Sequence, residues 1–285
     1  MSLNIRPADR ADVQALGRIT FDAFTTISKQ HGFPPDFPAV EAGIGLWDHL
    51  LNSPSVYPIV AEQDDRVVGG NALWESSAVG GVGPVVVDPN AQNASVGRRM
   101  MERVLARAAE RRLPSVRLVQ AAVHNRSLSL YTKLGFAVRE PLACMIGTPR
   151  PQQIAGHTAR PAMEKDLDAC NELCRRVHGH DRAAELSGAV RQKTATVVES
   201  GGRIVGYATS IGFFGHAVGE TTEAIKSLIL LTPPLTGPGM LVPTRNTELF
   251  RWCLESGLRV SQPMNLMSLG LYNEPAGAFM PSILY

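Results

Sequence analysis

The sequence predicts an α/β (α+β) protein made of two tandem domains that share one fold. Three observations support this prediction. Along the first half of the chain, apolar residues follow strand and helix periods in turn, element after element. Prolines and glycines between residues 148 and 156 then mark a linker. Beyond this linker, three short segments of the first half return in the same order, as expected of a duplicated fold.

The elements of the first half follow from apolar periodicity, capping residues and turn residues. Asp9 or Asp12 can begin the first helix, and Asp64 and Asp65 form a turn between two strands. Gly135 ends the last helix, because glycine readily adopts the left-handed conformation. The expected order is strand, two helices, three strands, helix, strand, helix and strand, over residues 4–6, 9–24, 39–51, 57–62, 66–74, 82–87, 95–112, 116–120, 125–134 and 137–147.

The repeats define the predicted domains. Arg6 and Asp12, within one segment, return at the same spacing as Arg160 and Asp166. Two further segments, 66–69 and 132–138, return as 203–206 and 254–260. We therefore predict a first domain, a linker and a second domain, over residues 1–148, 149–156 and 157–285.

The strongest chemical signal is a strand, turn and helix over residues 83–109. The turn carries small, polar and basic residues where the helix begins. A helix start presents unpaired N–H groups and a partial positive charge, so it is a ready anion site, and Arg98 would add a full charge there. The glycines at 80, 81 and 83 do not match the spacing of a dinucleotide loop, and the Gly-Lys-Ser/Thr of a Walker loop is absent.

Two linked motifs resemble those of the GNAT acetyltransferase superfamily. Residues 87–97 resemble its acyl-CoA loop, V-x-P-x-x-Q/R-x-x-G-x-G/A, with one departure: Ser95 replaces the first glycine. Serine is small and can serve as a helix N-cap. Residues 125–136 look like the family's N-x-x-[AS]-x-x-x-Y-x-x-x-G-F helix, in which Asn125 can cap the helix.

The resemblance implies a fold, a co-substrate and a binding site. Each domain would be a mixed, mostly antiparallel sheet flanked by helices, and the first would bind acetyl-CoA as co-substrate. The pantetheine arm would pair with the strand edge at Val85 and Val87, and backbone amides near Ser95 would hold the pyrophosphate. The residues expected at the acetyl-CoA site are Val85, Val87, Gln92, Asn93, Ala94, Ser95, Val96, Gly97, Arg98, Asn125 and Tyr131.

The resemblance also implies an N-acetyltransferase in which the amine attacks the thioester directly in a ternary complex. Such a reaction needs an acceptor for the ammonium proton and an acid for the departing thiolate. Tyr131 matches the family's tyrosine acid, or else it is a structural aromatic residue. Candidates for the base are Glu75 and His124, which can equally be a solvated strand end and a turn residue, and water can serve instead.

The second domain has lost the motifs of the first. Its segment between residues 207 and 241 has no V-x-P-x-x-Q sequence, and Cys253 stands where the last helix should present tyrosine. Cys170, Cys174 and His178 fall on one helix face, which suggests a metal site, but the apolar residues beside them indicate a core face. We therefore predict a degenerate copy and no metal.

Composition excludes several classes of function. The 285 residues are 44% hydrophobic and 19% charged, with a net charge of +2, which is ordinary for a globular protein. The sequence has no block of lysines and arginines, so a nucleic-acid partner is not expected. The arginines of the helix after the loop are expected to form a solvated face, except for the first one or two. No apolar run approaches the roughly 18 residues that span a membrane, and no signal peptide is evident. We expect a cytoplasmic monomer or homodimer.

The acceptor is the least determined feature. In the family, the loop at residues 31–38 and the helix carrying Trp47 would border its pocket, and their aromatic, proline-rich character suggests a small-molecule amine with an apolar part. A non-catalytic acyl-CoA sensor is the rival function, although the presence of Tyr131 and Asn125 favours an enzyme. A longer acyl-CoA donor or a peptide N-terminus as acceptor are further alternatives.

Overall fold

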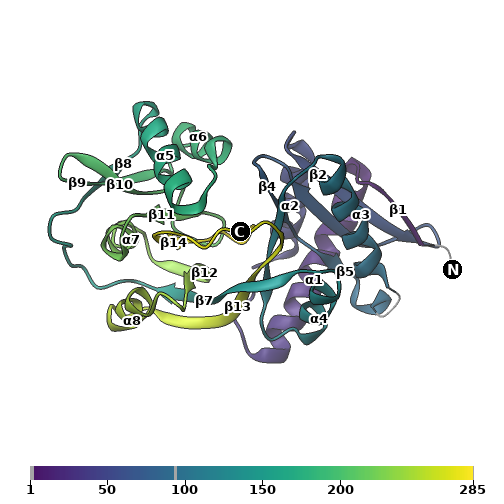
Figure 1. The fold of residues 1–285 in the computed structure, drawn as a ribbon. Helices are drawn as coiled ribbons and strands as arrows, with labels where there is room; N and C mark the ends of the chain where they lie inside the picture. Colours follow the sequence, from purple (N-terminus) through teal and green to yellow (C-terminus); the bar gives the residue numbers. More distant parts are fainter. Residues whose placement is uncertain (1–2, 93–94, 285) are drawn as a thin grey trace. The chain divides into compact units, whose positions relative to one another are not determined.

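The computed structural model describes residues 3–92 and 95–284, and their packing divides the chain into two compact units (Figure 1). The first unit comprises residues 1–118 and 124–136. The second unit comprises residues 119–123 and 137–285. No helix in the described ranges is long and apolar enough to cross a membrane.

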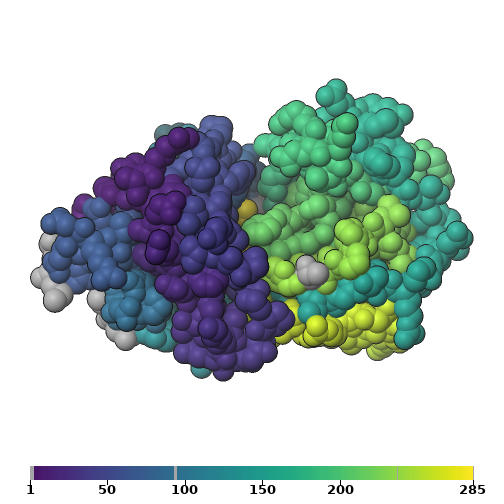
Figure 2. Space-filling model, turned by 180° about the vertical axis from the view of Figure 1, so that it is seen from behind, coloured from purple at the N-terminus to yellow at the C-terminus, as the bar shows by residue number. Residues whose placement is uncertain are grey.

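The first unit follows the predicted order of elements. Its helices α1 and α2 come early in the chain, and their purple residues form part of the surface seen in Figure 2. The bounds are β1 Leu3–Pro7, η1 Arg10–Asp12, α1 Val13–His31, α2 Val40–Asn52, β2 Val56–Gln63, β3 Arg66–Trp74, β4 Val79–Val82, β5 Val86–Val87, η2 Pro89–Ala91, α3 Val96–Glu110, β6 Ser115–Ala121 and α4 Asn125–Lys133.

The sheet of the first unit is mixed and mostly antiparallel. Strands β1, β2 and β3 pair antiparallel in sequence order, and β4 continues the sheet antiparallel to β3 and parallel to β6. The single strand expected over residues 82–87 is wrong, because the chain breaks into β4 and β5 at the cis Gly83-Pro84 bond. Proline lacks the N–H that a continuous ladder needs, which accounts for the break.

The core of the first unit lies between its sheet and the pair α1 and α2. Trp47 is fully buried and donates a hydrogen bond from Nε1 to Thr20 Oγ1 at 2.7 Å. Gly17 and Gly43 let the two helices approach closely, since a Cβ on Gly43 would lie 2.5 Å from the Gly17 carbonyl oxygen. Any side chain here would force the helices apart.

The second unit repeats this order of elements, with α5, α6 and α7 shorter than α1, α2 and α3. Strands β8, β9, β10, β11 and β14 form one antiparallel sheet, and β7 pairs antiparallel with both β12 and β13. The bounds are β7 Ala137–Gly147, β8 Thr158–Pro161, η3 Glu164–Asp166, α5 Leu167–His178, α6 Ala183–Arg191, β9 Thr196–Ser200, β10 Arg203–Ala208, β11 Ala217–Gly219, α7 Thr222–Ile229, β12 Leu235–Pro243, α8 Thr247–Glu255, β13 Arg259–Gly270 and β14 Ala278–Met280.

Equivalent contacts in the two units support the duplication. Arg6 donates two hydrogen bonds of 2.8 Å to the Asp12 carboxylate, and Arg160 donates two of 2.7 and 3.0 Å to that of Asp166. The glycines that end α4 and α8 also agree, because Gly135 has φ 94° and Gly257 has φ 96°. The two units thus share the same local geometry at the Arg-Asp ion pair near their first helix and at the glycine after their last helix.

Strand β7 was predicted as the last strand of the first domain, but it packs in the second unit. Its bounds, Ala137–Gly147, match the prediction, but it packs within the second unit between β12 and β13. The division of the chain by packing therefore assigns β7 to the second unit, whereas the boundary predicted from the sequence repeats lies at residue 148. That predicted domain boundary remains a proposal.

Candidate active site

The loop before α3 is organised by an aspartate. Asp88 Oδ1 accepts hydrogen bonds from the backbone N–H and the side-chain amide of Asn90, at 2.9 and 3.1 Å. Asp88 Oδ2 lies 3.3 Å from Arg66 Nη2. The predicted contact residues Asn93 and Ala94 follow this loop and lie outside the described residues. The loop thus has a fixed start close to β3.

Ser95 adopts the backbone conformation that glycine would provide. Its φ of 62° and ψ of 11° lie in the left-handed region, which costs a residue with a Cβ about 1 kcal/mol. Ser95 occupies the N-cap position of α3, as expected, but the expectation that its side chain caps the helix is wrong, since it makes no capping hydrogen bond. The amides of the first turn are therefore not covered by this side chain.

Three elements converge at Gly97, in the first turn of α3. A Cβ built on Gly97 would lie 3.7 Å from Val87 of β5 and 3.7 Å from Leu130 of α4. Gln92, in the loop, accepts a hydrogen bond of 3.0 Å from Arg126 Nη1 in α4. The end of β5, the start of α3 and the helix α4 therefore meet around the amides of the predicted anion site.

Other predicted contact residues differ in exposure. Val96 is buried at 2% exposed and packs into the unit rather than toward solvent. Arg98 is exposed and forms an ion pair of 2.9 Å with Glu102, one turn along α3. Its guanidinium lies on the open surface of the first turn, where an anionic ligand can compete for it.

The strand edge at residues 85–87 is paired on one side. Val86 pairs with Gly70 and Val87 with Gly69 of β3. On the other side, β4 pairs with β6 from Val79 to Gly81, and no described strand pairs with 85–87 there. Unpaired backbone N–H and C=O groups on a strand edge are ready to pair with another extended chain.

Tyr131 lies in the last turn of α4. Its side chain is buried, at 8% exposed, and its ring contacts Phe136 with centroids 6.1 Å apart. Burial raises the pKa of the phenol, so the hydroxyl stays protonated at neutral pH. The hydroxyl therefore carries its proton and can donate a hydrogen bond, while burial makes it a weaker acid.

His124 immediately precedes α4, and its side chain is half-buried. Burial lowers the pKa of the imidazole, and the charges of Arg126 and His31 lower it further. His124 is therefore neutral at pH 7 and able to accept a proton. The expectation that Asn125 caps α4 is wrong by one residue, because α4 begins at Asn125 and His124 holds the N-cap position without a side-chain cap.

Glu75 follows β3 and lies in an ion-pair cluster with α3. Arg107 Nε lies 2.8 Å from Oε1, and Arg111 Nε lies 2.7 Å from Oε2. The Glu75 side chain is only 8% exposed. These arginines belong to the face predicted as solvated, so sequence periodicity missed their role. Both oxygens of Glu75 are already engaged by cations.

The residues expected near the acceptor divide into core and rim. Trp47 belongs to the core, so it does not line a pocket. The aromatic loop is partly exposed, with Phe37 packed on Phe24 at 5.5 Å and Phe33 stacked on His31 at 5.6 Å. This loop forms an apolar rim at the end of α1.

The second unit lacks the features from which an anion site is predicted in the first. The helix α7 follows β11 as α3 follows β5, but Thr221 Oγ1 accepts a hydrogen bond from Ala224 N and caps it. Cys253, in the place of Tyr131, is fully buried, and burial raises its pKa to about 12. The second unit thus has a capped helix start in place of the start of α3 and a thiol in place of the Tyr131 hydroxyl.

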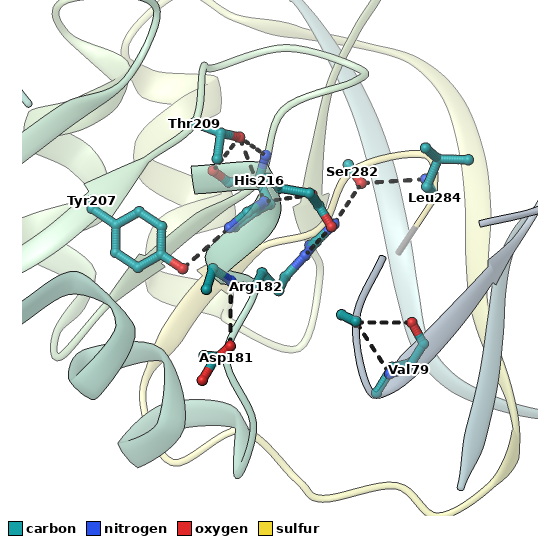
Figure 3. A network of polar contacts seen from close by, with 11 residues as sticks. Val79, Asp181, Arg182, Tyr207, Thr209, His216, Ser282 and Leu284 are labelled. Atoms are coloured by element: carbon teal, nitrogen blue, oxygen red, sulfur yellow. Dashed lines mark hydrogen bonds and ion pairs between the residues drawn. The ribbon is translucent and has the colours of Figure 1, made fainter. Parts of the chain in front are cut away.

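A buried polar network occupies part of the second unit (Figure 3). Tyr207 Oη and His216 Nε2 lie 3.2 Å apart, and His216 Nδ1 lies 3.4 Å from Glu185 Oε2. Arg182 donates a hydrogen bond of 2.6 Å to the same oxygen of Glu185 and one of 3.4 Å to Ser282. The network was not predicted, because its members are scattered along the chain. It joins α6, β10, the residue before β11 and Ser282.

The helix face with two cysteines is a core face. Cys170 and Cys174 are buried among Leu173, Val177 and Tyr207. Burial raises the pKa of the Cys170 thiol to about 12, so it stays protonated. Among the described residues, no group of three metal-ligating side chains is arranged to hold a metal ion.

Comparison with known proteins assigns the fold. The model of the acetyltransferase (GNAT) family matches residues 21–136, which include the loop, α3 and α4. This part of the chain belongs to the GNAT acetyltransferase family. A segment of this GNAT protein is 32% identical over 102 residues to "IAA acetyltransferase" of Azospirillum brasilense. That match covers 33% of the chain and just under two thirds, 66%, of the relative's length.

Solved structures extend the likeness to both units of the GNAT chain. A proposed acetyltransferase from Pyrococcus horikoshii is similar with a TM-score of 0.74 at 17% identity, over 97% of this chain and 94% of that chain. A tandem GNAT protein from the clavulanic acid biosynthesis pathway is similar with a TM-score of 0.57 at 11% identity, over 94% and 98%. The predicted fold of two tandem GNAT-like domains is therefore confirmed.

Proposed function

We propose that the first unit transfers an acetyl group from acetyl-CoA to a primary amine of a small molecule. The main support is the geometry at Gly97, where β5 and α4 both contact the start of α3, which has no side-chain cap. A helix start with free amides fits a diphosphate, and the left-handed Ser95 supplies the turn that the family's glycine supplies. The residues present therefore fit the co-substrate.

Binding would use backbone groups more than side chains. The amides of Ser95 to Arg98 would face the pyrophosphate, with the Arg98 guanidinium freed from Glu102. The open edge at Val85 and Val87 would pair with the extended pantetheine arm. When bound, acetyl-CoA supplies an activated thioester. Asn93 and Ala94 would complete the loop.

In the proposed reaction, the amine nitrogen attacks the thioester carbon in a ternary complex. A C–N bond forms, and the C–S bond breaks. His124, neutral at pH 7, accepts the proton that the amine loses, directly or through water. Tyr131, whose hydroxyl is held protonated by burial, gives a proton to the departing thiolate. We assign the base to His124 rather than Glu75, because Glu75 is engaged by two arginines.

The aromatic rim supports an acceptor with an apolar part. Phe33 and Phe37 are partly exposed beside the end of α1, and His31 lies close enough to His124 for its charge to act on that imidazole. An amine seated against this rim would approach His124. The second unit is proposed as a degenerate copy without acetyl-CoA chemistry.

The test measures binding and turnover separately. Calorimetry with CoA should give one site, and a Gly97→Asp variant should lose it, because a carboxylate there repels the diphosphate. An Asp48→Asn variant, changed on the exposed surface of α2, is the control. Thiol release from acetyl-CoA is then followed across a panel of primary amines and peptides.

Each outcome separates the rivals. Release with small amines supports the proposal, and release with peptides alone would replace the acceptor. Faster release from propionyl-CoA than from acetyl-CoA would change the acyl group. Tight CoA binding without release from any amine would favour a non-catalytic sensor.

A further inference from the structure

The second unit contains a pocket of about 370 Å³ at the starts of α7 and α8. All its lining residues belong to the second unit, in which α7, β12 and β14 lie close together (Figure 1). Three carboxylates line it, those of Glu140, Glu220 and Glu274, with one guanidinium, that of Arg245. The wall is therefore polar and mainly acidic.

Glu140 is the unusual member of this wall. It lies on β7, is only 3% exposed, and its Oε1 is buried without a hydrogen-bond partner among the described residues. Its Oε2 lies 3.6 Å from Arg245 Nε. An orphaned buried oxygen costs about 1–3 kcal/mol, so this atom calls for a donor from outside the chain. Burial raises the pKa of the carboxyl, and the charge and the backbone N–H of Arg245 offset this only in part.

The other charges of the pocket leave room for an incoming cation. Glu220 Oε1 lies 2.9 Å from Arg176 and 2.6 Å from Arg203, two arginines that do not line the pocket. Arg245 is shared between Glu140 at 3.6 Å and Glu274 at 3.2 Å, and its side chain is 56% exposed. Such an exposed, divided ion pair is weak, so Arg245 can swing away from Glu140.

The rest of the lining selects among cations. Pro243, Pro275, Ala278 and Phe279 provide apolar surface, which suits an alkyl chain and not a hydrated metal ion. No metal-holding group of three ligating side chains occurs here or elsewhere in the described ranges. An ammonium has three N–H donors, and an alkyl tail would cover the apolar lining.

The position of the pocket contrasts with the first unit. It lies at the capped start of α7, the counterpart of the uncapped start of α3, and Glu220 immediately precedes the cap residue Thr221. A carboxylate here repels the diphosphate that the first unit attracts. The second copy has therefore exchanged an anion site for an acidic pocket.

We propose that this pocket binds a small primary alkylamine, with the ammonium on Glu140 Oε1 and the alkyl chain against Phe279 and Pro275. Glu274 supports the ammonium from the rim. The site is separate in sequence from the acceptor site proposed for the first unit and does not depend on acetyl transfer. A ligand there gives the second unit a function of its own.

The test is calorimetric titration of the whole chain with butylamine at pH 8, without acetyl-CoA. Wild type should bind, and Glu140→Gln should weaken binding by about tenfold or more, as loss of one hydrogen bond to a charged group requires. Glu274→Gln should weaken it less, and its exposed side chain puts folding at little risk. Glu255→Gln, an exposed acid of α8 outside the pocket, should leave binding unchanged.

Several results would overturn the proposal. Failure of wild type to bind butylamine, or equal affinity of wild type and both pocket variants, would remove the site. Equal binding of butanol would show that the charge is irrelevant, and displacement of butylamine by Mg²⁺ at equal concentration would show a metal site. Since acetyl-CoA is absent, none of these results depends on the function proposed for the first unit.

Discussion

Glu75 Oε1 lies 2.8 Å from Arg107 Nε, at the point where β3 ends beside α3. With Arg111 on its second oxygen, the carboxylate joins a strand end to a helix surface. Arg107 also lies over the ring of Tyr57, 5.0 Å from its centroid. This arrangement is that of a structural clamp and leaves no oxygen free to take a proton from an amine.

We expect Glu75→Gln to lower stability without lowering kcat. The arginines are partly exposed, so the loss should be about 1 kcal/mol, measured by denaturant unfolding. Arg111→Gln, which removes one partner, should lower stability in the same direction. A hundredfold fall in kcat in a folded Glu75→Gln protein would restore Glu75 as the base.

Tyr131→Phe should lower kcat by about 100-fold, because it removes the proposed proton donor. CoA affinity should stay nearly the same, since the ring and its contact with Phe136 remain. Stopped-flow thiol release and calorimetry measure the two quantities. Tyr57→Phe, which removes a hydroxyl bonded to Arg103, is the matched control. Unchanged turnover in Tyr131→Phe would leave the tyrosine a structural role only.

The pH profile tests His124. As a base it must be neutral, so kcat/KM should fall as pH drops through its pKa, below 6.5. His31→Asn removes a charge that lowers this pKa, so the acidic limb should move to higher pH. His157→Asn, in the second unit, should not move it. A limb that persists unchanged in His124→Asn would assign it to another group.

The sequence predicted the local elements better than the contacts between them. Residues 66–74 and 137–147 form strands with the predicted bounds, because apolar and β-branched residues with flanking turns specify them locally. Pro84 broke the next strand, although apolar residues continue through it. Periodicity describes one element at a time, and the break depends on missing ladder hydrogen bonds.

The candidate site was partly predictable for the same reason. The loop and the start of α3 are a local motif, so their positions were predictable from sequence. The clamp of Glu75 by Arg107 and Arg111 joins residues far apart in sequence, as does the bond from Arg126 to Gln92. Likewise, the sequence did not predict a role for Glu140, because a single acidic residue in a strand is unremarkable until the pocket around it is known.

Ser95→Gly should raise stability by up to about 1 kcal/mol, since glycine adopts the left-handed conformation without steric cost. CoA affinity should be retained, because the backbone amides stay in place. Ser53→Gly is the matched control: Ser53 also flanks a helix, as the C-cap of α2, but has φ −89°, so glycine there should lower stability. Both are measured by denaturant unfolding. A destabilised Ser95→Gly protein would show that the Ser95 side chain makes a stabilising contact.

Asp12 and Asp166 offer the same test in each unit. Burial raises the pKa of Asp12, but Arg6 and the Asp9 backbone N–H together lower it further than burial raises it, and Arg160 lowers the pKa of Asp166. A lowered folded pKa contributes stability above the unfolded pKa, near 3.9, and that contribution is lost as pH falls through the folded pKa. Asp12→Asn and Asp166→Asn should each cost about 2 kcal/mol at pH 7.

The measurement is unfolding of wild type and variants between pH 7 and pH 2. The difference between each variant and wild type should shrink below about pH 4, where the wild-type carboxylate becomes protonated. Asp48→Asn, on the exposed surface of α2, should cost little at any pH. Equal losses at pH 7 and pH 2 would show that shape, and not charge, makes these aspartates stabilising. A loss in one unit alone would show that the duplicated ion pair has kept its energetic role in only one copy.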